Sequence, residues 1–110
     1  MTEQYRGWNI PTLPTLKKYG ADENVFKAII DRQGGVCPVC KKVPSTGRGV
    51  FDHEHVRGWK TMTPAERLTY VRGVTCWFCN HSYLGRGITV EKARNAAQYL
   101  LDYALRRTSL

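Results

Sequence analysis

The chain has 110 residues, 42% of them hydrophobic, and 17 basic against 9 acidic side chains give a formal net charge of +8. This length suits one compact domain, and the composition excludes a disordered chain. No apolar run reaches the length of a membrane span and no signal-peptide pattern is present, so we expect no membrane contact and a cytoplasmic location. The positive charge favours a polyanion such as nucleic acid, although it fits an ordinary basic domain equally well.

The first twenty residues are predicted to form an extended arm. They contain Pro11 and Pro14, and two prolines three positions apart oppose regular helix. We therefore divide the chain into an arm over 1–20 and a domain over 21–110.

A helix is predicted directly after the arm. Asp22 has the character of an N-cap, and Gly34-Gly35 ends the helix because glycine accepts the left-handed conformation of a C-cap. The helical spacing of four apolar residues gives the segment one buried face; they are Val25, Phe26, Ile29 and Ile30.

The middle of the chain is predicted to hold a β-hairpin and a short helix. Residues 50–53 are expected to be the second strand of a hairpin, because a turn-rich stretch over 44–49 precedes them. A capping box at Thr63, with proline at the first helical position, predicts a helix to about Tyr70. Residues 71–75 are short and β-prone.

Two helices are predicted at the C-terminal end. Residues 76–84 are expected to form a brief helix that Gly85 stops, and Thr89 caps a long amphipathic helix. The fold class is therefore α+β. The apolar face of the long helix comprises Val90, Ala93, Ala97, Leu100, Leu101 and Ala104.

All four cysteines fall into two Cys-x-x-Cys pairs, namely Cys37 with Cys40 and Cys76 with Cys79. Two such pairs supply four thiolates for a tetrahedral zinc ion, and because no position stays open the zinc would be structural. The alternatives are four unrelated buried cysteines or a redox dithiol, and a redox dithiol needs a βαβ pattern that is absent here. In a reducing cytoplasm cysteines bind metal more often than they form disulfides.

Three segments around these cysteines carry a specific resemblance. They are QGGVCPVC over 33–40, DHEH over 52–55 and VRGVTCWFCN over 71–80. They resemble the phage recombination endonuclease VII family, a zinc-bearing branch of the HNH, or ββα-metal, nucleases. The resemblance covers about residues 22–101. It implies a small ββα-metal (HNH) domain with a zinc-bound β-hairpin, flanked by an N-terminal helix and a long C-terminal helix.

The resemblance also implies metal-dependent hydrolysis of DNA phosphodiester bonds, by nicking or double-strand cutting, with branched DNA among the substrates. Asp52 and Asn80 would hold a catalytic Mg²⁺ or Mn²⁺, and His53 would be the general base. Carboxylate and amide oxygens suit Mg²⁺, and histidine suits proton transfer near neutral pH. Because neighbouring strand residues point to opposite faces, Asp52 and His53 reach one phosphate only if the backbone twists or bulges there. His55 has three open roles: phosphate contact, support of His53, or packing.

Arg57, Arg72 and Arg86 lie near these motifs and are candidates for phosphate binding, with Arg72 favoured by the resemblance. The chain departs from the family in two places. Residues 56–70 add a capped helix, which we interpret as a DNA contact, a partner contact or padding. An acidic residue expected shortly after the asparagine is replaced at about Tyr83, which leaves the identity of the preferred ion open.

Two further readings stay open. A zinc-dependent DNA-binding module without catalysis explains the cysteines and the charge, but not the coincidence of Asp52, His53 and Asn80. The resemblance also implies a homodimer formed through the C-terminal helix, and this is compatible with an enzyme. The resemblance also suggests the resolution of branched DNA junctions. Because the chain is short for that family, we favour general or structure-influenced nicking. A phage-encoded chain would act in the host cytoplasm.

Overall fold

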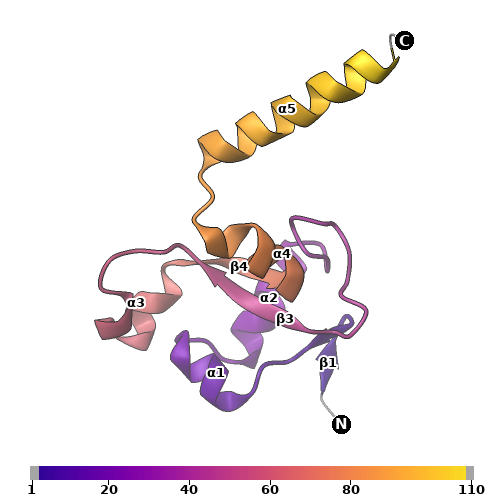
Figure 1. Cartoon of the computed structure of the whole chain (residues 1–110). Coiled ribbons are helices and arrows are strands. Elements are labelled where there is room, and N and C mark those ends of the chain that lie inside the picture. Colours follow the sequence, from indigo (N-terminus) through magenta and orange to yellow (C-terminus); the bar gives the residue numbers. More distant parts are fainter. Residues whose placement is uncertain (1–2, 109–110) are drawn as a thin grey trace.

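The computed structural model describes residues 3–108 and has the predicted α+β composition (Figure 1). It contains two antiparallel hairpins, each of two strands, and five α-helices. In chain order the elements are β1 Gln4–Tyr5, β2 Trp8–Asn9, α1 Leu13–Lys18, α2 Glu23–Arg32, β3 Gly49–His53, η1 Trp59–Thr61, α3 Pro64–Leu68, β4 Val71–Cys76, α4 Trp77–Ser82, η2 Leu84–Arg86 and α5 Val90–Thr108, where η denotes a 3₁₀ turn.

The central hairpin pairs β3 with β4, with Phe51 opposite Val74. The prediction of residues 50–53 as the second strand of a hairpin is therefore wrong, because β3 is the first strand and its partner follows the 56–70 segment. The region before β3 forms turns, and Lys41 there adopts a positive φ of 63° that interrupts extended backbone. Local patterns located both strands but not their pairing.

The core lies between this hairpin and the helices that pack on it. Helix α2 packs against β4, and α4 packs against both strands (Figure 1). The Gln33 side chain pairs with the backbone of β4. Its amide accepts from the Val74 N–H and donates to the Val74 carbonyl, both at 2.8 Å. The buried hydrophobic side chains are Trp8, Leu16, Phe26, Ile29, Ile30, Cys37, Phe51, Val74 and Cys79.

The extended arm predicted over residues 1–20 is not observed within the described part, residues 3–20. This part forms the β1–β2 hairpin and α1, and both pack on the domain. Pro14 does not prevent the helix because it lies in the first turn, where a backbone N–H has no helical partner. The Trp8 side chain is fully buried and donates to the Gly35 carbonyl at 2.8 Å, and Leu16 is buried beside it.

The shorter helices begin as predicted and differ at their ends. Thr63 caps α3 in a reciprocal capping box with Glu66, but α3 ends at Leu68, before the predicted Tyr70. Gly85 does not stop the helix after the cysteines. It lies inside η2, and the chain turns away at Gly87, which has a φ of +73°.

Helix α5 extends away from the rest of the molecule (Figure 1). Thr89 caps it as predicted, accepting from the Lys92 N–H at 3.1 Å. Every residue from Val90 to Thr108 is exposed, so the predicted apolar face covers no part of the described core. Within residues 3–108 no helix combines the length and the apolar character needed to cross a bilayer.

Candidate metal centre and active site

The four cysteines meet in space. The sulfur atoms of Cys37, Cys40, Cys76 and Cys79 all lie within 4.8 Å of one another, and Cys40 and Cys76 are 3.9 Å apart. A tetrahedral zinc with Zn–S bonds of about 2.3 Å places its sulfurs about 3.8 Å apart. All four thiols are free. The donor set and its spacing therefore fit a zinc ion.

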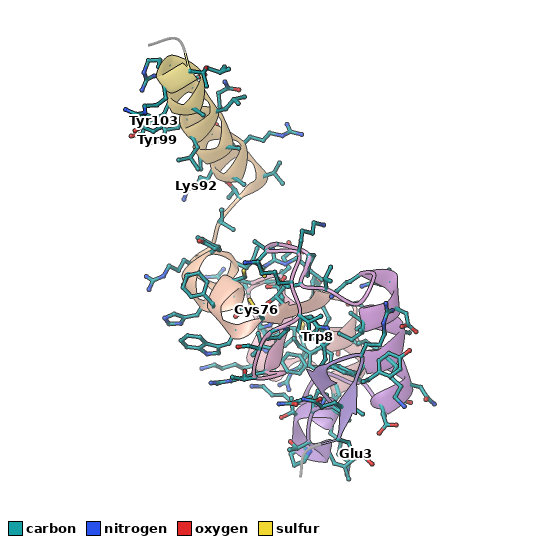
Figure 2. The ribbon with its side chains drawn as sticks, turned by 90° about the vertical axis from the view of Figure 1, so that its right-hand side faces the viewer. Glu3, Trp8, Cys76, Lys92, Tyr99 and Tyr103 are labelled. Atoms are coloured by element: carbon teal, nitrogen blue, oxygen red, sulfur yellow. The ribbon has the colours of Figure 1, made fainter. Side chains whose placement is uncertain are left out.

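Local backbone structure builds this cluster from both knuckles. In the first, the Lys41 N–H donates to the Cys37 carbonyl at 2.8 Å and the Cys37 N–H donates to the Lys42 carbonyl at 2.9 Å. In the second, Cys76 ends β4 and caps α4, because its sulfur accepts from the Cys79 N–H at 3.4 Å. The cluster thus fixes α4 at the end of the central hairpin, as Figure 2 shows at the labelled Cys76.

The surroundings of the thiols favour one thiolate in particular. Burial opposes ionisation of Cys37, but backbone N–H groups of Cys40, Cys76 and Val39 outweigh it and lower the pKa of the Cys37 thiol to about 7. Burial and the neighbouring thiols raise the pKa of Cys79. A bound cation removes this conflict, because it stabilises all four thiolates together.

Asp52 of β3, Arg72 of β4 and Asn80 of α4 form one polar cluster. The Asp52 carboxylate is buried and accepts from Arg72 in a bidentate ion pair, with N···O distances of 2.8 and 2.9 Å. The Asn80 amide nitrogen donates to the same carboxylate at 3.3 Å. The sequence analysis singled out Asp52, Arg72 and Asn80 as candidate site residues, and the three lie together. It did not indicate the ion pair between Asp52 and Arg72.

A β-bulge lies at this cluster. Asp52 is opposite Gly73 and His53 is opposite Val71, so Arg72 is the extra residue on β4. Such a bulge bends the strand and changes the direction of nearby side chains. An irregular backbone is thus present at the position where a shared role of Asp52 and His53 would need one.

His53 lies in an aromatic setting. Its imidazole stacks on the Trp59 indole, with ring centroids 3.9 Å apart and an interplanar angle of 12°. The His55 ring is 5.1 Å away and the Tyr19 ring 5.9 Å away. Burial, followed by the nearby His55, lowers the pKa of His53, and this outweighs the opposite influence of Asp52. These surroundings favour the neutral, proton-accepting form of the imidazole.

Open surface adjoins these residues. A cleft of about 420 Å³ lies beside Glu54, His55 and Arg72, and the η2–α5 connection forms its other wall. A second hollow of about 370 Å³ lies against His53, His55 and Trp59. Sequence reasoning missed Glu54 and Trp59; strand alternation from Asp52 indicates Glu54, whereas no local pattern indicates Trp59.

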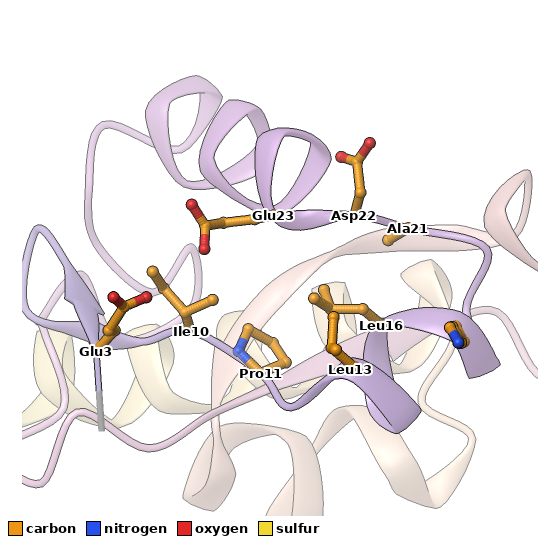
Figure 3. A pocket seen from close by; sticks show the side chains of 9 residues that line it. Glu3, Ile10, Pro11, Leu13, Leu16, Ala21, Asp22 and Glu23 are labelled. Carbon is orange, nitrogen blue, oxygen red and sulfur yellow. The ribbon is translucent and has the colours of Figure 1, made fainter. Parts of the chain in front are cut away.

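The other nominated arginines lie outside the polar cluster. Arg57 is exposed in the connection after β3, and Arg86 is exposed at the end of η2. A separate cavity of about 500 Å³ lies between the N-terminal segment and the start of α2 (Figure 3). Its charged lining is mainly acidic, with Glu3, Asp22 and Glu23 against Lys17, which disfavours a phosphate-bearing ligand there.

Comparison with known proteins shows the family of the chain. No curated protein and no solved structure matches the chain significantly. The sequence profile of the recombination endonuclease VII family matches residues 13–104, a range that starts before the residues of the motif resemblance and includes α1 and both cysteine pairs. That family implies a nuclease that acts on DNA. The chain therefore belongs to the recombination endonuclease VII family.

Proposed function

We propose that this protein is an HNH-type endonuclease that hydrolyses DNA phosphodiester bonds with a divalent cation, Mg²⁺ or Mn²⁺. The observation that carries the proposal is the meeting of the Asp52 carboxylate and the Asn80 amide, 3.3 Å apart, next to His53 at a strand bulge. The order β3, β4, α4 supports the ββα-metal arrangement. One structural zinc on the four cysteines would join the 37–40 turn to the end of β4 and to α4.

The polar cluster fits a hard divalent cation. The Asp52 side chain is buried and carries a negative charge, which Arg72 balances in the absence of a cation, so a bound cation would take the place of Arg72 at the carboxylate. Asp52 and the amide oxygen of Asn80 would hold the ion. When bound, the ion supplies positive charge for the phosphate and for the departing oxygen.

The remaining residues have roles that follow from their places. His53 takes the proton of the attacking water, which suits an imidazole held neutral. His55 borders the cleft beside Arg72, where it supports His53 or contacts phosphate. Arg72 lines the cleft and keeps 42% of its side chain exposed, so once a cation takes its place at Asp52 its guanidinium would be free to bind a phosphate. Arg57 and Arg86 add positive charge to the surface on which a DNA strand would lie.

A plasmid assay tests the proposal. Supercoiled plasmid is incubated with the zinc-loaded protein and Mg²⁺, beside His53→Ala and the control His81→Ala, which removes a histidine that stacks on Trp77 instead. We expect wild type and His81→Ala to nick the plasmid, and His53→Ala to be slower by about 100-fold or more. Plasmid that stays supercoiled with wild type, or equal rates for wild type and His53→Ala, would refute the enzyme.

A DNA-binding module without catalysis is the second candidate, and the net charge of +8 favours it as much as the enzyme. Salt-sensitive binding is expected of both, so only the plasmid assay separates them.

For the substrate, we propose general or structure-influenced nicking in the cytoplasm. Equal rates on a four-way junction, a linear duplex and a plasmid are expected for general nicking, and a rate on the junction at least tenfold higher would indicate junction resolution.

A homodimer through α5 belongs to the same proposal. The helix exposes large apolar side chains, including 63% of Leu100 and 52% of Leu101, and Figure 2 shows Tyr99 and Tyr103 standing clear of the domain. A second copy of the helix would cover the predicted apolar face that includes Leu100 and Leu101. We expect wild type and the control Asn95→Asp, on the opposite face, to sediment as dimers and Leu101→Asp as a monomer; a monomeric wild type contradicts the dimer.

A further inference from the structure

We infer that the 56–70 segment positions His53 for catalysis, with Trp59 as the ring that orients the imidazole and Arg67 as the residue that holds Trp59 in place. The inference rests on the proposed endonuclease function. It adds a role to a segment for which the sequence left DNA contact, partner contact and padding open.

The first observation is the stack itself. The indole of Trp59 and the imidazole of His53 are nearly parallel, at 3.9 Å between ring centroids, which is close contact for two planar rings. Tyr19 contacts both, at 5.8 Å from Trp59 and 5.9 Å from His53. The imidazole is therefore restrained by one ring from the 56–70 segment and one ring that follows α1.

The second observation is the way in which Arg67 fixes Trp59. Its guanidinium donates to the Trp59 carbonyl at 3.2 Å, the Lys60 carbonyl at 2.9 Å and the Lys18 carbonyl at 3.2 Å. It also lies 5.6 Å from the centre of the Trp59 ring, within range of a cation–π contact. One planar side chain thus joins three carbonyl groups on two separate segments, a task for which the fork of arginine is suited.

The third observation is the backbone contact between α3 and the turn after α1. Gly20 has a φ of +69°, and a Cβ atom added there would overlap the Pro64 carbonyl. The capping box of Thr63 and Glu66 starts α3 at this contact. The segment is therefore attached to the domain at its backbone, and its position relative to His53 is determined.

These contacts have a consequence for the reaction. His53 lies at the end of β3 beside a bulge, where the strand pairing alone does not set the direction of the ring. A general base has to keep its nitrogen aligned with the attacking water, and small misplacements lower the rate strongly. Trp59 and Arg67 take no part in the proton transfer, so they are positioning residues.

The test compares Trp59→Leu, Trp59→Phe and Arg67→Met with wild type, His53→Ala and the control Lys60→Met. The control removes a positive charge from the same segment but keeps the carbonyl that Arg67 binds. Plasmid nicking gives kcat and KM, and NMR of the His53 ring protons reports the stack, because an aromatic ring above them shifts their resonances upfield.

We expect Trp59→Leu to lower kcat about 10-fold at unchanged KM, and to move the His53 resonances downfield. Trp59→Phe keeps a planar ring and should recover kcat to within about threefold of wild type. Arg67→Met retains Trp59 and should lower kcat in the same direction, which covers the case that Trp59→Leu fails to fold. Lys60→Met should match wild type.

Two results would overturn the inference. One is a kcat for Trp59→Leu and Arg67→Met equal to that of wild type. The other is a Trp59→Phe variant as slow as Trp59→Leu. In that case a planar ring at position 59 does not restore kcat, and Trp59 does not act by orienting the imidazole. Both leave the proposed function standing if His53→Ala is inactive. A wild type that does not cleave at all refutes the proposed function, and the inference with it.

Discussion

The buried ion pair between Asp52 and Arg72 gives the most direct energetic test of the site. Only 5% of the Asp52 side chain is exposed, against 42% of the Arg72 side chain. Breaking a fully buried pair costs about 3–5 kcal/mol, and an exposed pair contributes about 0–1 kcal/mol. Because Arg72 is partly in solvent and Asn80 still donates to Asp52, we expect Arg72→Ala to lower the free energy of unfolding by about 2 kcal/mol.

A double-mutant cycle measures the pair itself. Urea unfolding of wild type, Arg72→Ala, Asp52→Asn and the double variant, all loaded with zinc, gives the coupling energy between the two side chains. We expect about 1–2 kcal/mol, in the range found for residues in contact. Arg57→Ala, which removes the same charge from an exposed position, is the control and should change stability little.

Added Mg²⁺ extends this test to the proposed metal site. A cation held by Asp52 replaces the lost positive charge, so Mg²⁺ should stabilise Arg72→Ala more than wild type. The reasoning is refuted by a coupling below about 0.5 kcal/mol, or by an Arg72→Ala variant that is no less stable than Arg57→Ala.

Four further predictions concern the fold. Cys76→Ser should lose stoichiometric zinc, measured by elemental analysis, and lower Tm by roughly 10 °C or more; unchanged zinc content would disprove the four-thiolate site. Thr75→Val should raise the free energy of unfolding by about 1 kcal/mol in urea melts, because the buried Thr75 hydroxyl has no hydrogen-bond partner among the described residues; a loss of stability would contradict this. Gly20→Ala should cost about 2 kcal/mol or more, since it combines a positive φ with overlap on α3, and a neutral result in the same assay would exclude that close approach. Hydrogen bonds from Tyr5 and then Arg6 lower the pKa of Asp31, so its stabilisation is present above the ordinary pKa near 3.8 and is lost as pH falls through the lowered value; urea melts across this range should show a shallower acid loss for Asp31→Asn, and parallel curves would argue against it.

Short-range chemistry explains what could be predicted for the site. The spacing of the two Cys-x-x-Cys pairs alone predicts a four-thiol cluster that could hold a metal ion, because each pair presents two sulfurs from one tight turn. A joint role of Asp52 and His53 depended on a twist or a bulge, since a regular strand points neighbouring side chains apart, and a bulge is present at this pair. Helix starts at Asp22, Thr63 and Thr89 followed from side chains that cap their own backbone.

Other features depend on residues far apart in the chain. The N-terminal segment packs on the domain because the Trp8 side chain is buried in the core and donates a hydrogen bond to the Gly35 carbonyl. The residues of that segment alone do not indicate this partner. The same is true of the pairing of β3 with β4 across the 56–70 segment.

The sequence by itself determined the donor groups and the local turns that carry them, because these depend on neighbours a few residues away. The tertiary structure alone decided that Arg72 pairs with Asp52 and that Trp59 stacks on His53. Both contacts join segments whose proximity exists only after the core has formed, and the energy of a buried charge or a stacked ring depends on that proximity.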